Sequence, residues 1–180
     1  MQSKLELSLS LTIDWLKFAE SKNAMLIAAH GAAIFGIFTL LESGSISNSM
    51  YVFYIYQALL FLFLGAVFCL ISFIPQVDVP WIESINPTKE EDNLLAYADI
   101  AKYDSKLYLE AIYKQEAIDL NEINPFEEDL AELIVIYSRI AMRKYSLFNS
   151  GVWCTLSAIV THVIALIIYL IRKSHIKARA

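Results

Sequence analysis

Three long apolar runs constrain this chain more than any other feature of its sequence. They cover Ala24–Leu41, Met50–Ile74 and Gly151–Ile171, and none of them contains Asp, Glu, Lys or Arg. At a rise of ~1.5 Å per residue, helices of these lengths reach roughly 27, 37 and 31 Å, against a hydrocarbon core of about 30 Å. Because a chain in lipid has to satisfy its own backbone hydrogen bonds, each run is predicted to be a membrane-spanning helix.

The predicted fold is an all-α membrane protein with three transmembrane helices and a helical, water-facing block between the second and the third. A hydrophobic fraction of 57% exceeds what a soluble domain of 180 residues normally has, which agrees with this prediction. Met1–Asn23 is interpreted as an amphipathic helix rather than as a signal peptide. The expected organisation is an N-terminal helix at 1–23, spans at 24–41, 50–74 and 150–171, a sensor block at 75–149 and a basic tail at 172–180.

The distribution of Lys and Arg predicts the orientation of the spans. Ten of the fourteen basic residues lie in the N-terminal segment or in the block, four lie in the tail, and the loop Glu42–Ser49 has none. Positively charged loops stay on the cytoplasmic side, so the N-terminus and the block are predicted to be cytoplasmic. Three crossings place the basic tail on the opposite side, which conflicts with the same rule.

Local signals in the block predict helices throughout. Thr88-Lys89-Glu90-Glu91 has the pattern of a capping box and predicts a helix to about Tyr103. Asp104-Ser105 predicts the start of a second helix, which ends near Gln115. Asn124-Pro125 predicts a third, which continues unbroken into the last span. Val77–Ile85, which contains a proline, is expected to be extended. A stripe spaced alternately by four and three residues predicts the packing face of the long helix: Phe126, Leu130, Leu133, Tyr137, Ile140, Lys144 and Leu147.

No catalytic site or metal site is expected from the sequence. It has no phosphate-binding glycine loop, no nucleophile motif and no metal-ligand spacing. His30 and His162 lie inside apolar runs, where an interhelical hydrogen bond is the simplest role and a gating role stays open.

Basic and aromatic residues of the block suggest where a ligand could bind. Arg139, Arg143 and Lys144 place three cations within six residues, next to the membrane. Lipid headgroups attract such residues, and so does a ligand that carries a phosphate. Six tyrosines in the block serve either in packing near an interface or in stacking on a base. With fifteen acidic residues against seven basic ones, the block is not expected to bind nucleic acid.

The first span has a face of small residues. Ala28, Ala32 and Gly36 recur every four residues, a spacing that lets helices approach closely. His30 points nearly opposite, because two residues turn a helix by roughly 200°. A helix with polar and close-packing faces on opposite sides is buried on both, so the chain is expected to form a homo-oligomer.

Several short motifs, in a fixed order, resemble one known family. Phe18-Ala19-Glu20-Ser21-Lys22 leads into the first span, and Pro75 follows the second. Asn93–Ala101 has the features of an aromatic-bearing helix, and Arg143-Lys144-Tyr145 precedes the last span. In this order and spacing the chain resembles the membrane-spanning effectors of Pycsar, a bacterial anti-phage system. Three positions depart from the family pattern: Glu20, Asn23 and Tyr97, where it has Asp, Ala and Phe.

The resemblance implies a non-enzymatic effector of the bacterial cytoplasmic membrane, without a cofactor. Its partners would be membrane lipids and a cyclic pyrimidine mononucleotide, cUMP or cCMP, whose binding impairs the membrane and causes abortive infection. Such a ligand needs a cation for its phosphate and a ring for its base. The candidate cations are Lys22, Arg139, Arg143 and Lys144, and the candidate rings are Tyr97, Tyr108 and Tyr145. The alternative function is a membrane scaffold or accessory subunit whose block binds another protein.

Overall fold

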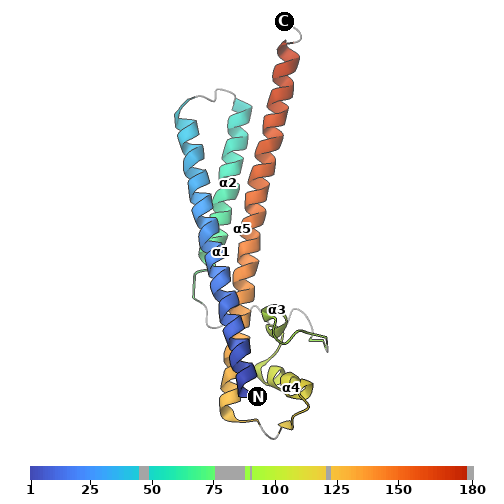
Figure 1. The fold of residues 1–180 in the computed structure, drawn as a ribbon. Coiled ribbons are helices and arrows are strands. Elements are labelled where there is room, and N and C mark those ends of the chain that lie inside the picture. The colour runs from blue at the N-terminus through green and yellow to red at the C-terminus, as the bar shows by residue number, and fades with distance from the viewer. Residues whose placement is uncertain (45–48, 76–87, 90, 121–122, 178–180) are drawn as a thin grey trace. The chain divides into compact units, whose positions relative to one another are not determined.

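The computed structural model describes residues 1–180 except 45–48, 76–87, 90, 121–122 and 178–180 (Figure 1). The described residues form helices, turns and loops and contain no strand. The helices are α1 (Gln2–Glu42), α2 (Ser49–Ile71), α3 (Tyr97–Ile100), α4 (Ser105–Gln115) and α5 (Pro125–Lys177). The all-α prediction is therefore confirmed.

Contacts divide the chain into two compact units. Unit 1 contains Met1–Ser21 and Ile74–Ser146, and unit 2 contains Lys22–Phe73 and Leu147–Ala180. The helices α1 and α5 each contribute a segment to both units without interruption. The N-terminal helix and the block between the second and third spans thus belong to the same unit, although two spans separate them in the sequence.

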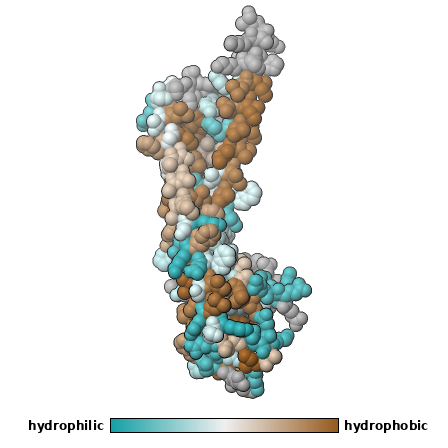
Figure 2. Space-filling model, viewed as in Figure 1, coloured by the Kyte–Doolittle hydropathy of each residue, from teal (hydrophilic) through white to brown (hydrophobic). Residues whose placement is uncertain are grey.

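Unit 2 contains the apolar parts of α1, α2 and α5. Each of these three helices is long and apolar enough to cross a membrane, which confirms the three predicted spans. Many of their large side chains are exposed, Phe35 and Trp153 among them, as expected for helices that face lipid. In Figure 2 the surface of this unit is accordingly mostly coloured as hydrophobic.

Hydrogen bonds of two histidines join the helices of unit 2. Nε2 of His30 lies 2.7 Å from Oγ1 of Thr155, and Nε2 of His162 lies 2.8 Å from the hydroxyl of Tyr51. The Thr155 hydroxyl donates to the carbonyl of Gly151, so His30 Nε2 is the donor in the first of these bonds. Both histidines therefore have the interhelical hydrogen bonds that the sequence suggested.

Two glycines allow α2 and α5 to approach closely. A Cβ atom at Gly151 would lie 3.3 Å from the carbonyl oxygen of Gly65 and 2.8 Å from the sulfur of Cys69. A Cβ atom at Gly65 would lie 2.8 Å from the His30 ring. Larger residues do not fit at either position without a shift of the neighbouring atoms, so these two glycines set the distance between the spans.

The small-residue face of the first span is not used in these contacts. Ala28, Ala32 and Gly36 are all exposed within the single chain, and a Cβ atom at Gly36 would have no neighbour within 4 Å. The intrachain packing of α1 instead involves His30, on the other side of the helix. The oligomer interface at the small residues stays a prediction.

Unit 1 is held together by a mixed aliphatic and aromatic core. The core side chains come from α1, α4, α5 and the segment around α3, and each of these elements buries one face. They are Leu5, Ile100, Tyr103, Tyr108, Leu109, Ile112, Tyr113, Leu130, Ala131, Ile134 and Val135. Burial of a large aliphatic or aromatic side chain contributes about 1.5–3 kcal/mol to folding. This core therefore anchors the segment around α3 to α1, α4 and α5.

The predicted starts of α4 and α5 are confirmed. Helix α4 begins at Ser105, with Asp104 at the N-cap position but without a side-chain capping bond. Helix α5 begins at Pro125. Before it, the amide of Glu127 donates to Oδ1 of Asn124 at 3.0 Å, and the Asn124 amide donates back to the Glu127 carboxylate at 3.4 Å. This reciprocal pair caps the first turn of α5.

The predicted helix from Thr88 to Tyr103 is wrong. Among the described residues of this segment only Tyr97–Ile100 are α-helical, and turns surround them. The amide of Lys89 donates to the Asp92 carboxylate instead of opening a helix. Side-chain acceptors thus compete successfully with helical carbonyls for the backbone amides. The expected extended segment Val77–Ile85 lies outside the described residues.

The predicted packing stripe of the long helix is partly wrong. Leu130 is buried as expected, but Phe126 and Leu133 are about half exposed. The buried face is centred instead on Ala131, Ile134, Ser138 and Ala141, a row rotated around the helix from the predicted one. Leu130, Ala131, Ile134 and Val135 of this face pack against core side chains of α1 and α4.

Candidate ligand site

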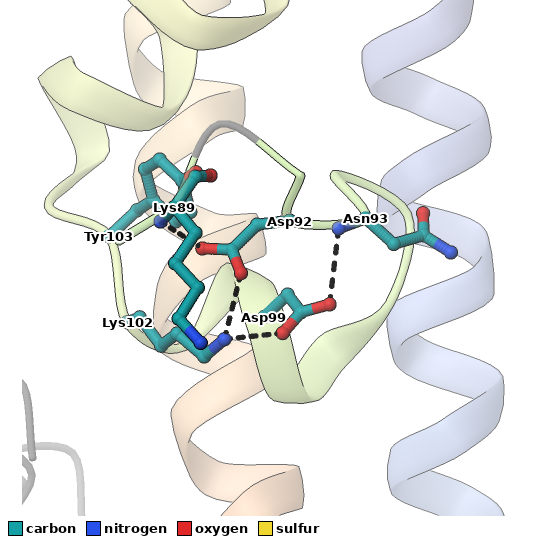
Figure 3. A network of polar contacts seen from close by, with 6 residues as sticks. All are labelled: Lys89, Asp92, Asn93, Asp99, Lys102 and Tyr103. Carbon is teal, nitrogen blue, oxygen red and sulfur yellow. Dashed lines mark hydrogen bonds and ion pairs between the residues drawn. The ribbon is translucent and has the colours of Figure 1, made fainter. Parts of the chain in front are cut away.

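A network of charged side chains fixes the loop before α4 (Figure 3). Nζ of Lys102 lies 2.9 Å from the Asp92 carboxylate and 2.5 Å from that of Asp99. The second oxygen of Asp92 accepts the amide of Lys89 at 2.8 Å, and the second oxygen of Asp99 accepts the amide of Asn93 at 3.1 Å. One lysine therefore holds two turns of the chain together through two carboxylates.

These contacts keep the network charged. The hydrogen bond from the Lys89 amide, followed by that from Lys102, lowers the pKa of Asp92. Hydrogen bonds to Asp99 and Asp92 raise the pKa of Lys102. Both shifts favour the ionised forms, so the network stays ion-paired at neutral pH.

Two of the three candidate rings lie in contact. Tyr97 of α3 stacks on Tyr145 of α5, with ring centroids 5.0 Å apart and an angle of 20° between the planes. On α1, Trp15 approaches Tyr97 at 5.6 Å. Burial raises the pKa of both tyrosines, so their hydroxyls stay protonated. The sequence analysis missed Trp15, since no spacing along the chain links it to a residue more than eighty positions away.

The third ring, Tyr108, is a core residue. Its side chain is completely buried, its hydroxyl donates to the carbonyl of Leu94 at 2.9 Å, and Oγ of Ser8 lies 2.8 Å from the same oxygen. Burial raises the pKa of Tyr108 to about 12. The ring therefore joins three segments of unit 1, and a role in ligand binding stays a prediction.

The candidate cations of α5 have separate partners. Arg139 donates to the carbonyls of Ala101 and Tyr103, at 3.3 and 2.8 Å. Arg143 donates to the carbonyl of Ile74 at 3.4 Å, and the buried Lys144 pairs with Glu20 at 3.0 Å. Arg139 and Arg143 are four residues apart and share a face of α5, whereas Lys144 is rotated by about 100° from Arg143.

The fourth candidate cation, Lys22, belongs to unit 2. Its Nζ lies 5.5 Å from the centre of the Phe148 ring, within the range of a cation–π contact. The structure thus brings Tyr97 and Tyr145 together. Participation of these residues in ligand binding stays a prediction.

A polar cavity of about 520 Å³ lies elsewhere in unit 1, between the loop before α3 and helix α4. Its lining includes the side chains of Lys89, Tyr103 and Lys114. The sequence analysis did not name the two lysines as ligand-binding residues, and it included Tyr103 only as one of the six tyrosines of the block. Within the described part of the chain, no group of three or more His, Cys, Asp or Glu side chains is arranged to hold a metal ion.

Comparison with known proteins identifies the family. The sequence model of the Pycsar effector protein domain (PycTM) matches residues 4–171, which include all three spans and the block between them. The chain belongs to the Pycsar effector family. It is 29% identical over 140 residues to the Pycsar effector protein RsPycTM of a Rhizobium species, an alignment that covers 76% of this chain and 78% of the relative. No solved structure matches.

The family assigns this chain to the transmembrane effectors of anti-phage defence. The three candidate spans agree with a membrane protein of this kind. The absence of catalytic activity from this chain stays a prediction.

Proposed function

We propose that this Pycsar effector is a membrane-damaging protein that a cyclic pyrimidine mononucleotide, cUMP or cCMP, switches on. Unit 1 would sense the nucleotide, and the spans of unit 2 would impair the cytoplasmic membrane, which stops growth of the infected cell. The observation that carries this proposal, beside the family match, is the continuity of α1 and α5. Each helix contributes to the core of unit 1 and continues as a span of unit 2.

This continuity allows a ligand to act on the membrane without a further protein. A ligand shifts an equilibrium only by its different affinities for the two states. A nucleotide bound to unit 1 therefore has to favour one arrangement of the segments contributed by α1 and α5. A change in the arrangement of those segments therefore occurs within the same helices that continue as membrane spans.

Leakage from liposomes tests the proposal. Purified protein in vesicles loaded with a self-quenched dye should release the dye when cUMP or cCMP is added, and a cyclic purine mononucleotide serves as the control. Equal leakage with and without every nucleotide contradicts the proposal and favours the scaffold function. Calorimetry on the same protein shows whether the nucleotide binds at all.

The proposal requires unit 1 to face the cytoplasm. Single cysteines replacing Ser47 and Ser105, in a chain whose native Cys69 and Cys154 are changed to Ala, report the side of each segment. In intact cells a membrane-impermeant thiol reagent should label position 47 and not position 105, because the loop around Ser47 lacks Lys and Arg. The reverse labelling would show that the sensor faces outward.

A further inference from the structure

We infer that the cavity between the loop before α3 and helix α4 is the nucleotide site of unit 1. This inference rests on the proposed function. It places the nucleotide at a site different from Arg139, Arg143 and Lys144, the cations next to the third span. The cavity has a volume of about 520 Å³, and pockets of about 300–1,000 Å³ typically hold small organic ligands. A cyclic mononucleotide falls in this size class.

The lining of the cavity fits an anion that carries an aromatic base. Lys89 from the loop and Lys114 from α4 provide two ammonium groups. The ring of Tyr103 provides an aromatic surface, and Thr88 and Gln115 provide a hydroxyl and an amide for hydrogen bonds to the sugar and the base. One phosphate, one ring and several polar edges are the groups that a cyclic mononucleotide presents.

Among the described residues that line the cavity, only Asp92 has a carboxylate, and both of its oxygens already accept hydrogen bonds. It accepts hydrogen bonds from the Lys89 amide and from Nζ of Lys102, one on each oxygen. Both carboxylate oxygens are therefore engaged within the wall of the cavity. Lys89 and Lys114 add two positive charges to the same lining.

The walls of the cavity are held in place before any ligand arrives. The ion pairs of Lys102 with Asp92 and Asp99 fix the loop, and the Tyr103 hydroxyl lies 3.3 Å from the carbonyl of Lys89 (Figure 3). The hydroxyl of Tyr108 on α4 donates to the carbonyl of Leu94 and fastens the loop to the helix. A preformed site loses less entropy when a ligand binds.

Other cavities in the described part of the chain suit an anion less well. One of about 300 Å³ is lined by the carboxylates of Glu110, Glu128, Asp129 and Glu132, which repel a phosphate. Another, also of about 300 Å³, lies between the spans and is lined by apolar and aromatic side chains. The geometry therefore favours the cavity with the two lysines.

Binding measurements on the full-length protein in nanodiscs test this location. In Lys114→Gln and in Lys89→Gln the affinity for cUMP or cCMP should fall tenfold to hundredfold, because each loses a charge-assisted contact to the phosphate. The matched control is Lys106→Gln, an exposed lysine of α4 that does not line this cavity, and its affinity should stay within twofold of the wild type. Arg143→Gln and Lys144→Gln test the site predicted from the sequence.

Hydrogen exchange provides a second, independent measurement. Bound nucleotide should slow exchange in peptides that cover 88–94 and 111–115 of the wild type. If the wild type binds a nucleotide but the cavity variants retain its affinity and the protection lies elsewhere, the location is wrong while the proposed function stands. If the wild type binds no cyclic mononucleotide, the proposed function fails and this site fails with it.

Discussion

The hydroxyl of Tyr108 joins three segments of unit 1 that lie far apart in the sequence. Its ring is completely buried, its hydroxyl donates to the Leu94 carbonyl, and Ser8 of α1 bonds to the same oxygen. Because burial raises its pKa to about 12, the tyrosine remains a hydrogen-bond donor at every physiological pH. Tyr108→Phe removes the oxygen atom and leaves the ring.

The free energy by which Tyr108→Phe destabilises unit 1 can be worked out from the two hydrogen bonds of the hydroxyl. Each typically contributes about 0.5–1.5 kcal/mol, so the pair gives about 1–3 kcal/mol. The upper half of this range is expected, because the Leu94 carbonyl would lose its donor inside the protein. Since about 1.4 kcal/mol corresponds to a factor of ten, the opening equilibrium of unit 1 should rise roughly tenfold to hundredfold.

Hydrogen exchange of peptides that cover α4 measures this equilibrium in the folded, membrane-embedded protein. Tyr137→Phe is the matched control, since Tyr137 is only half buried and its hydroxyl bonds to no described residue. In Ser8→Ala/Tyr108→Phe the second substitution should add less than it does alone, because the two side chains share one bond. Exchange in Tyr108→Phe within twofold of the wild type would refute the view that this hydroxyl ties α1 to the block.

Two further predictions concern the spans. Gly151→Ala should lower the free energy of unfolding of the detergent-solubilised protein, measured by thermal unfolding, by about 1–3 kcal/mol, because a Cβ atom there would lie 2.8 Å from the sulfur of Cys69 and overpack the contact. The control is Gly31→Ala, where nothing lies within 4 Å and the substitution should be neutral or stabilising. Equal effects of the two substitutions would contradict the close contact at Gly151. Ala32→Leu should reduce the oligomer fraction in nanodiscs, as measured by mass photometry, because it blocks the exposed small-residue face of α1. A monomeric wild type would exclude the predicted interface.

Local signals explain why so much of the fold could be predicted. Spans follow from length and lack of charge, and the start of α5 follows from Asn124 and Pro125, whose conformational preferences act over one turn. The segment after Thr88 has an equally good local signal, yet it folds differently. Its amides are satisfied by Asp92 and Asp99, which Lys102 holds in place. Such tertiary partners are not visible in a capping pattern.

The cavity could not be predicted for a related reason. Lys89 and Lys114 lie twenty-five positions apart in an acidic block, where single lysines are typical of a solvated surface. The cations beside the third span were the more conspicuous group because they are close together in the sequence. Closeness in the sequence does not make them one site, however, because Arg139, Arg143 and Lys144 each contact a different partner.

A chain of contacts links the proposed cavity to the third span. Asp92 lines the cavity, Lys102 joins it to Asp99 at α3, and α3 carries Tyr97, which stacks on Tyr145 of α5. Helix α5 then continues into unit 2. A ligand that moves the loop can therefore bias α5 through one stacked pair, which contributes about 0.5–1.5 kcal/mol beyond burial.

Tyr97→Leu tests whether this pair transmits the signal. If it does, nucleotide affinity measured by calorimetry should stay within threefold of the wild type, whereas the dye leakage that the nucleotide causes should fall. Phenylalanine at this position keeps the stacking surface and should restore leakage. If Tyr97→Leu instead weakens binding tenfold or more while Lys114→Gln does not, the base stacks at Tyr97, as the sequence first suggested, and the cavity has another role. If binding and leakage both stay unchanged, the signal reaches α5 by a route that does not involve the stack.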